Sequence, residues 1–267
     1  MTAPASESTA GAPLLAVRDV TVRFGGLVAN DGVSLAVAAG HVAALVGPNG
    51  AGKTTLFNVI AGTVRPTSGQ VLLDGTDLTA LGTRRRARLG LGRTFQNLSL
   101  VADLSALDNV AVGLGRFRCT GLPGALLQTR RARREDREIR ELARAALGFV
   151  GLAGVAHRPA GELPYGDRRR VELARALALG PRLMLLDEPS AGMGAGETAT
   201  LADIVRRACS ELGVTVLLVE HDMSVVRSLA QETTVLDLGR VLTSGPTDAV
   251  LADPQVAAAY LGAGTLA

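Results

Sequence analysis

The chain has 267 residues, a length that fits one large domain or two small ones and is long enough to bury a sizeable core. Hydrophobic residues make up 47% of it, which excludes disorder for the bulk of the chain, and without an apolar run of roughly 18 residues a transmembrane helix is excluded as well. The net charge of +3 is too small by itself to indicate binding to nucleic acid.

The first residues and the cysteines bear on the cellular compartment. Residues 1–12 lack the basic start and apolar stretch of a secretory signal, so they are predicted to form a short disordered tail. The two cysteines, Cys119 and Cys209, do not have C-x-x-C spacing. This argues against a disulfide scaffold or a zinc site and suits the cytosol.

Strand and helix patterns alternate along the chain, which predicts an α/β architecture around a largely parallel sheet. A short apolar run at 42–46 leads straight into a glycine-rich loop, and helical spacing follows from Thr54 to Ala61, where Gly62 ends it. The strand patterns before and after this unit indicate an antiparallel element. The predicted strands of this first part are 14–24, 33–37, 42–46 and 70–73.

From about residue 97 to 165 the strand patterns vanish. The segment 128–148 is predicted to be a charged helix whose apolar positions include Ile139 and Ala143. This predicts a helical subdomain inserted into the α/β core at about 97–165. Apolar strands return after it, at 183–187, 215–219 and 233–237.

The arginine-rich run from Arg130 to Arg140 could be a nucleic-acid patch. Acidic residues such as Glu135 and Glu138 are interleaved with it, and it holds no aromatic residue for base stacking. A solvated helix face is therefore the preferred interpretation, and no nucleic-acid partner is expected.

Residues 47–54 read Gly-Pro-Asn-Gly-Ala-Gly-Lys-Thr and fit the phosphate-loop pattern G-x-x-x-x-G-K-[ST] between a strand and a helix. Glycines let successive N–H groups turn inward, and the following helix adds its positive end. Lys53 is the single lysine beside 27 arginines, which suggests a site that needs a compact ammonium. The alternative, a glycine-rich turn without function, is disfavoured by this context. The residues expected to bind ATP are Gly47, Pro48, Asn49, Gly50, Ala51, Gly52, Lys53, Thr54 and Thr55.

The apolar strand 183–187 is followed at once by a second carboxylate. In this setting Asp187 is expected to hold Mg²⁺ together with the Thr54 hydroxyl, while Lys53 reaches the β- and γ-phosphates. Glu188 can polarise the attacking water as general base. The alternative interpretation is an acidic turn after a core strand.

Together these residues resemble the nucleotide-binding subunits of ABC transporters over about residues 14–262. The resemblance implies a P-loop NTPase (RecA-like) core with an antiparallel β subdomain and an inserted α-helical subdomain, all within residues 13–267. It also implies roles for three residues that would otherwise be read as structural. Gln96 would touch Mg²⁺ and water and relay to a membrane partner, His221 would contact the γ-phosphate, and Phe24 would stack on adenine.

The family signature, usually Leu-Ser-Gly-Gly-Gln, is replaced here by Leu-Pro-Tyr-Gly-Asp at 163–167. The resemblance implies that Gly166 keeps the close backbone approach to the opposite subunit's ATP. Pro164 offers neither a hydroxyl nor an N–H, and Asp167 adds a negative charge near phosphate. Gly194 stands where the family usually has Asp or Asn. These changes predict a weaker ATP sandwich but not a loss of nucleotide binding.

Several stretches resemble the ATPase subunits of branched-chain amino-acid importers, and a long helical insert favours the larger, LivG-like type. These stretches are Arg93–Gln96, the Tyr of the signature loop, Val219–Val226 and Asp253–Gly262. ATPases of urea or amide importers and of lipopolysaccharide export remain alternatives, as does a soluble regulatory ABC ATPase.

The resemblance also implies partners and a location. The expected partners are a second ATPase subunit, identical or different, two transmembrane permeases, and indirectly an extracytoplasmic solute-binding protein. The chain would act at the cytoplasmic face of the membrane with ATP and Mg²⁺.

Overall fold

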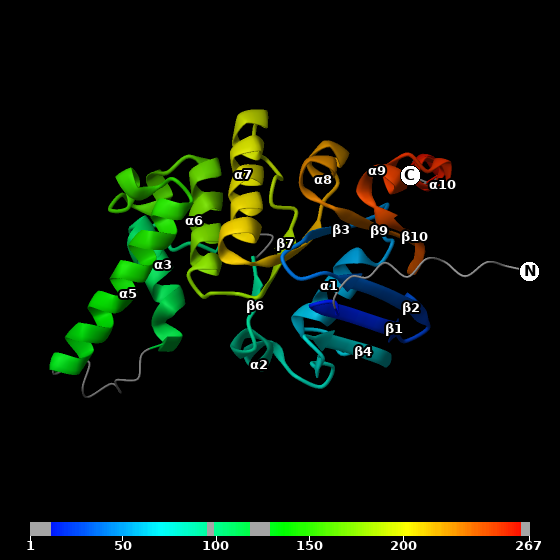
Figure 1. Ribbon diagram of the computed structural model, residues 1–267, viewed down its shortest axis with the longest axis horizontal. Helices are drawn as coiled ribbons and strands as arrows, with labels where there is room; N and C mark the ends of the chain where they lie inside the picture. Colours follow the sequence, from blue (N-terminus) through cyan, green and yellow to red (C-terminus); the bar gives the residue numbers. More distant parts are fainter. Residues whose placement is uncertain (1–11, 95–98, 118–128, 263–267) are drawn as a thin grey trace, which may run out of the picture.

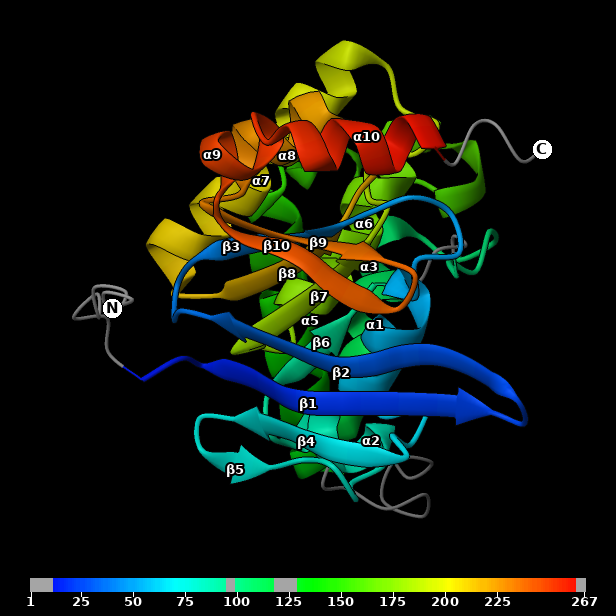
Figure 2. The same ribbon diagram turned by 90° about the vertical axis from the view of Figure 1, so that its right-hand side faces the viewer.

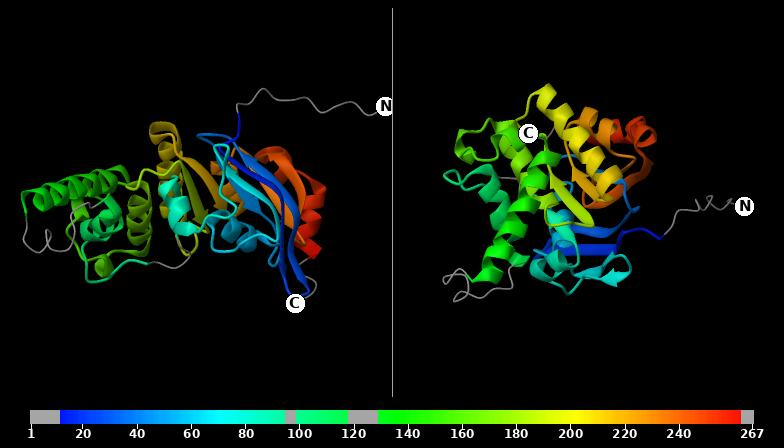
Figure 3. Two further views of the ribbon diagram at one scale, coloured as in Figure 1. Left: turned by 90° about the horizontal axis from the view of Figure 1, so that it is seen from below. Right: turned by 60° about the vertical axis from the view of Figure 1, so that its left-hand side comes forward.

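The computed structural model describes residues 12–94, 99–117 and 129–262. Two β-sheets occupy one end of the described molecule and a group of helices occupies the other (Figure 1). The view from below separates the same two ends (Figure 3, left).

The larger sheet contains β3 (Val42–Val46), β6 (Leu91–Arg93), β7 (Leu183–Asp187), β8 (Thr215–Val219), β9 (Glu232–Asp237) and β10 (Arg240–Pro246). Their order is β10-β9-β3-β8-β7-β6, and all run parallel except β10. β3, β7 and β8 are buried along their whole length, as their continuous apolar sequences require. These three coincide with predicted strands, so the prediction of a largely parallel α/β sheet is confirmed.

The smaller sheet is antiparallel, in the order β2-β1-β4-β5. Its strands are β1 (Leu15–Phe24), β2 (Leu27–Val37), β4 (Ser68–Leu73) and β5 (Thr76–Asp77). The predicted strand 33–37 is only the second half of β2. Its first half contains Asn30, Asp31 and Gly32, residue types that favour turns, and its pairing with β1 shifts register there.

Helix α1 (Lys53–Ala61) packs between the two sheets. Its buried Leu56 and Phe57 share one apolar cluster with residues of both sheets. The C-terminal end of α1 is held by Arg86 of α2 (Thr83–Arg88), whose guanidinium donates to the carbonyls of Val59 and Ile60 at 2.6 and 2.7 Å. Arg86 is 1% exposed, so its charge is buried, and its guanidinium donates hydrogen bonds to main-chain carbonyls.

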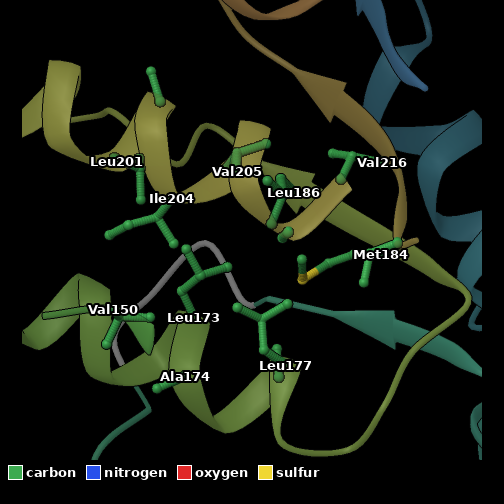
Figure 4. Packing of buried hydrophobic residues seen from close by; sticks show 14 of the residues in the cluster. Val150, Leu173, Ala174, Leu177, Met184, Leu186, Leu201, Ile204, Val205 and Val216 are labelled. Carbon is green, nitrogen blue, oxygen red and sulfur yellow. The ribbon is translucent and has the colours of Figure 1, made fainter. Parts of the chain in front are cut away.

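The helical end is formed by α3 (Ala106–Gly113), α5 (Arg130–Phe149) and α6 (Tyr165–Leu177), with short 3-10 turns at Leu114–Phe117, Ala153–Val155 and Ala160–Glu162. On α5, Arg131 and Arg134 pair with the glutamates four residues on, as a solvated face would. Figure 4 shows Val150, Leu173 and Leu177 packed towards α7 and the sheet. The two ends therefore share one continuous core, and the limits of the inserted subdomain stay a prediction.

The remaining helices are α7 (Ala195–Leu212), α8 (Met223–Leu229), α9 (Thr247–Leu251) and α10 (Pro254–Gly262). The last three gather over the edge of the larger sheet that is formed by β9 and β10 (Figure 2). Within the residues that the structure describes, no helix combines the length and the apolar character needed to cross a membrane.

Candidate nucleotide-binding site

The predicted phosphate loop lies between the end of β3 and the start of α1. At two positions of the loop, glycine is required because the main chain of a neighbouring strand lies too close to leave room for a Cβ. A Cβ at Gly47 would overlap the carbonyl of Leu236 on β9, and a Cβ at Gly52 would overlap the carbonyl of Ala29 on β2. Both glycines also have positive φ angles, of 147° and 94°. The loop is therefore wedged between the two sheets at the N-terminus of α1.

Lys53 is the first residue of α1 and is only 6% exposed. Its Nζ donates to the carbonyls of Gly47 and Pro48 at 2.6 and 2.8 Å, which leaves one ammonium hydrogen for another acceptor. Burial lowers the pKa of Lys53, and the charge of Glu188 opposes that shift. The compact ammonium predicted from the lone lysine is thus held inside the loop.

Asp187 ends β7 and is buried. Burial raises its pKa, and the Arg93 guanidinium, 3.4 Å away on β6, opposes that rise. Arg93 also donates to Asn58 Oδ1 at 2.8 Å and lies over the Phe57 ring, both on α1. Arg93 therefore ties the Asp187 carboxylate to the helix that follows the phosphate loop, a role that its position in the sequence did not reveal.

Glu188, the predicted general base, and His221, the predicted contact of the γ-phosphate, are brought together. His221 Nε2 lies 2.9 Å from Glu188 Oε1. Glu188 has a φ of 46°, in the left-handed region, which costs a residue with a side chain about 1–2 kcal/mol. Its N–H donates to the carbonyl of Val219 at the end of β8, and this contact holds it there. The strained backbone directs the carboxylate to His221 from the neighbouring strand.

Glu220 holds the segments next to this pair in place through hydrogen bonds. It is buried, and its carboxylate accepts from the N–H and hydroxyl of Ser190 at 3.0 and 2.6 Å and from the N–H of His221 at 3.1 Å. One side chain thus fixes both the segment after β7 and the segment after β8. Its burial beside a histidine was not apparent from the sequence.

The signature loop 163–167 packs on the segment 190–194 of the same chain. The Tyr165 hydroxyl donates to the Ala191 carbonyl at 3.1 Å, and a Cβ at Gly166 would overlap the carboxylate of Glu197. Asp167 forms an ion pair with Arg170 one turn along α6. The Arg170 guanidinium thus offsets part of the negative charge that Asp167 is predicted to bring near phosphate.

The remaining predicted site residues differ in exposure and in the elements that carry them. Phe24 ends β1 and is 52% exposed, so its ring is free to meet a planar ligand. Thr54 is exposed in the first turn of α1, and Gly166 is the second residue of α6. Gln96 falls outside the described residues.

Comparison with known proteins identifies the class. The model of the family described as ABC transporter matches residues 30–191, more than half of the chain, so the chain belongs to the ABC transporter ATP-binding family. A second model, described as branched-chain amino acid ATP-binding cassette transporter, matches residues 240–265. The fold and phosphate loop are therefore those of a transport ATPase.

The similar proteins are more specific. The chain is 42% identical to the high-affinity branched-chain amino acid transport ATP-binding protein BraF of Pseudomonas aeruginosa, over 94% of this chain and 98% of that protein. It is 38% identical to LivG of Escherichia coli K12, which carries the same description, over the same shares. Among solved structures, the ADP conformation of an ABC transporter's ATP-binding cassette matches with a TM-score of 0.83 and 30% identity, covering 94% of this chain and all of that one.

Proposed function

We propose that this chain hydrolyses ATP to power the import of branched-chain amino acids, together with a second ATPase subunit and two transmembrane permeases at the cytoplasmic face of the membrane. The observation that carries the hydrolytic part is the 2.9 Å contact between Glu188 and His221 beside the Lys53 loop. The names of BraF and LivG and the C-terminal match support the transported class. An extracytoplasmic solute-binding protein would deliver the amino acid to the permeases.

ATP binds with its phosphates in the loop 47–52 at the N-terminus of α1, where main-chain N–H groups and the helix dipole favour anions. Lys53 gives its remaining N–H to the β- and γ-phosphates. The half-exposed Phe24 ring stacks on adenine, and its exposure supports this role.

The donor set at the site fits Mg²⁺. A hydroxyl is offered by Thr54, which is exposed at the start of α1, and a carboxylate by Asp187 at the end of β7. Such oxygen donors are the ligands that Mg²⁺ prefers, and Gln96 would add a third. When bound, the ion neutralises phosphate charge.

Hydrolysis uses Glu188 as the general base that takes a proton from the attacking water. His221 holds the Glu188 carboxylate through its Nε2 and reaches the γ-phosphate. Gly166, at the N-terminus of α6, serves the ATP of the opposite subunit, because a helix N-terminus without a Cβ lets the main chain approach phosphate.

The test compares Glu188→Gln with Glu211→Gln, an exposed glutamate at the far end of α7. Glu188→Gln is expected to bind Mg-ATP normally and to hydrolyse it about 10² times more slowly or worse, the usual scale for a lost general base. It should also form a dimer with Mg-ATP in size-exclusion chromatography. Glu211→Gln should match the parent chain. A Glu188→Gln variant with the parent's turnover and no ATP-dependent dimer would contradict the proposal.

A soluble regulatory ATPase is the second candidate. The Pro164 signature favours it, because weak ATP-dependent dimerisation suits a regulatory nucleotide-binding protein better than a subunit that powers transport. Reconstitution with transmembrane permease subunits separates the two. A transport subunit should hydrolyse ATP faster with permeases and drive leucine uptake into vesicles. Uptake of urea instead of leucine would indicate a urea importer. An ATP hydrolysis rate that does not change when permeases are added would indicate a regulatory ATPase.

A further inference from the structure

The C-terminal helix α10 contacts the phosphate loop directly. The N–H of Gly47, the first residue of the loop, donates to the hydroxyl of Tyr260 at 2.7 Å, although the two residues are 213 positions apart in the sequence. An N–H that donates to Tyr260 is not offered to a phosphate. Gly47 is therefore an anchor of the loop, and α10 supplies the group that anchors it.

Gly47 is held from three directions. Its N–H donates to Tyr260, its carbonyl accepts from Lys53 Nζ at 2.6 Å, and its α-carbon rests against the main chain of Leu236. The same residue that binds Tyr260 thus also receives the ammonium proposed to bind phosphate. A shift of Gly47 would move the carbonyl that positions Lys53.

Tyr260 is itself held in place by its surroundings. Its half-buried ring packs against the apolar core, and Val256, one turn earlier on α10, is 5% exposed. Burial raises the pKa of Tyr260, so the hydroxyl is neutral at pH 7. On its other side the ring borders a groove of about 630 Å³ between α10 and α8, the helix that follows His221. Packing is open on that side, so the hydrogen bond to Gly47 fixes where the hydroxyl lies.

We propose that Tyr260 is a positioning residue for ATP binding. Its hydroxyl fixes Gly47 and thereby the phosphate loop and Lys53, so that nucleotide affinity depends on this one hydrogen bond from the C-terminal helix. This inference rests on the proposed role of the loop 47–54 in binding ATP.

The test is Tyr260→Phe in the full-length chain, which removes one hydroxyl and keeps the ring. Calorimetric titration should show an ATP affinity about two- to tenfold weaker, the scale of one net hydrogen bond. Labelling Val with ¹³C at the carbonyl and Gly with ¹⁵N selects the chain's three Val–Gly amides, which are Val46–Gly47, Val112–Gly113 and Val150–Gly151. Only the Val46–Gly47 signal should move, towards the shift of an amide without an acceptor.

Val256→Ala is the matched control, because it weakens packing on the same helix and keeps the hydroxyl. It should lower thermal stability but leave the Val46–Gly47 signal and the ATP affinity unchanged. Equal affinities for Tyr260→Phe and parent, an unmoved Val46–Gly47 signal, or an equal loss of affinity in Val256→Ala would each overturn the proposal. A parent chain that does not bind ATP would overturn the proposed function instead, and the amide signal would still test the Tyr260 contact.

Discussion

The signature loop allows a test in which one substitution has two separable effects. Pro164 is the N-cap of α6, and its side chain makes no capping hydrogen bond. In Pro164→Ser, the new hydroxyl can accept from an N–H in the first turn of α6, or it can bind the γ-phosphate of the opposite subunit's ATP. The substitution also restores a main-chain N–H. The first effect needs one chain, and the second needs an ATP-bound pair.

The two effects differ in size. A Ser cap adds about 0.5–2 kcal/mol to helix stability. Removing proline lowers the stability by about 0.4–1 kcal/mol, because the unfolded chain gains conformational entropy. The net change in the stability of the lone chain should therefore lie between about −0.5 and +1.6 kcal/mol. A charge-assisted hydrogen bond to phosphate contributes about 1.5–3 kcal/mol, or one to two decades in dimerisation. Asp167→Gln should give no gain, because it removes a partly exposed ion pair with Arg170 worth about 1 kcal/mol or less.

The assay is ATP-dependent dimerisation followed by light scattering, with turnover of the homodimer and urea unfolding without nucleotide measured beside it. We expect Pro164→Ser to strengthen the dimer and raise turnover, and Asp167→Gln alone to raise neither. If Pro164→Ser changes unfolding but not dimerisation, the hydroxyl only caps α6 and the idea of a weak signature is wrong. A gain from Asp167→Gln alone would mean that Arg170 does not neutralise Asp167.

Two further predictions concern buried groups. Arg86→Met should lower the free energy of unfolding in urea by about 3 kcal/mol or more, because the carbonyls of Val59 and Ile60 lose their donor, whereas exposed Arg88→Met on the same helix should change it by about 0.5 kcal/mol at most; equal effects would contradict the capping role of Arg86. Burial raises the pKa of the Cys209 thiol from 9.0 to about 11, so alkylation of the Cys209 peptide, followed by mass spectrometry, should be slow at pH 8 in the folded chain and faster in urea. Because this pKa is higher in the folded chain than in the unfolded chain, the difference contributes stability that is fully present below pH 9 and is lost as the pH rises through 11. A free energy of unfolding that rises over that range would contradict this prediction.

The parts of the fold that could be predicted are those in which local sequence and burial agree. β3, β7 and β8 are continuous apolar runs because both of their faces are buried, and such runs are visible without knowing the neighbours. β6 was missed because it has three residues, including Gly92, and owes its strand geometry to pairing with β7. The first half of β2 was missed because its turn-forming residues are held extended by β1.

The site divides along the same line. The phosphate loop is one contiguous motif, so its position between β3 and α1 followed from the sequence. The contact between Arg93 and Asp187 exists because β6 lies beside β7, and the contact between Tyr260 and Gly47 exists because α10 returns over the larger sheet. Pairings of this kind depend on strand order and tertiary packing, which no local pattern encodes.

A series of hydrogen bonds, joined by the peptide link between Ser190 and Ala191, connects the signature loop with the Glu188–His221 pair of the same chain. Tyr165 donates to the carbonyl of Ala191, and the adjacent Ser190 donates to Glu220. Glu220 accepts from the N–H of His221, whose ring meets Glu188. If the signature loop serves the opposite subunit's ATP, binding of that nucleotide can move Tyr165. This movement would displace the groups that position Glu188 in the ATP site of the same chain. The two ATP sites of a dimer are then coupled through this series of side-chain and main-chain hydrogen bonds.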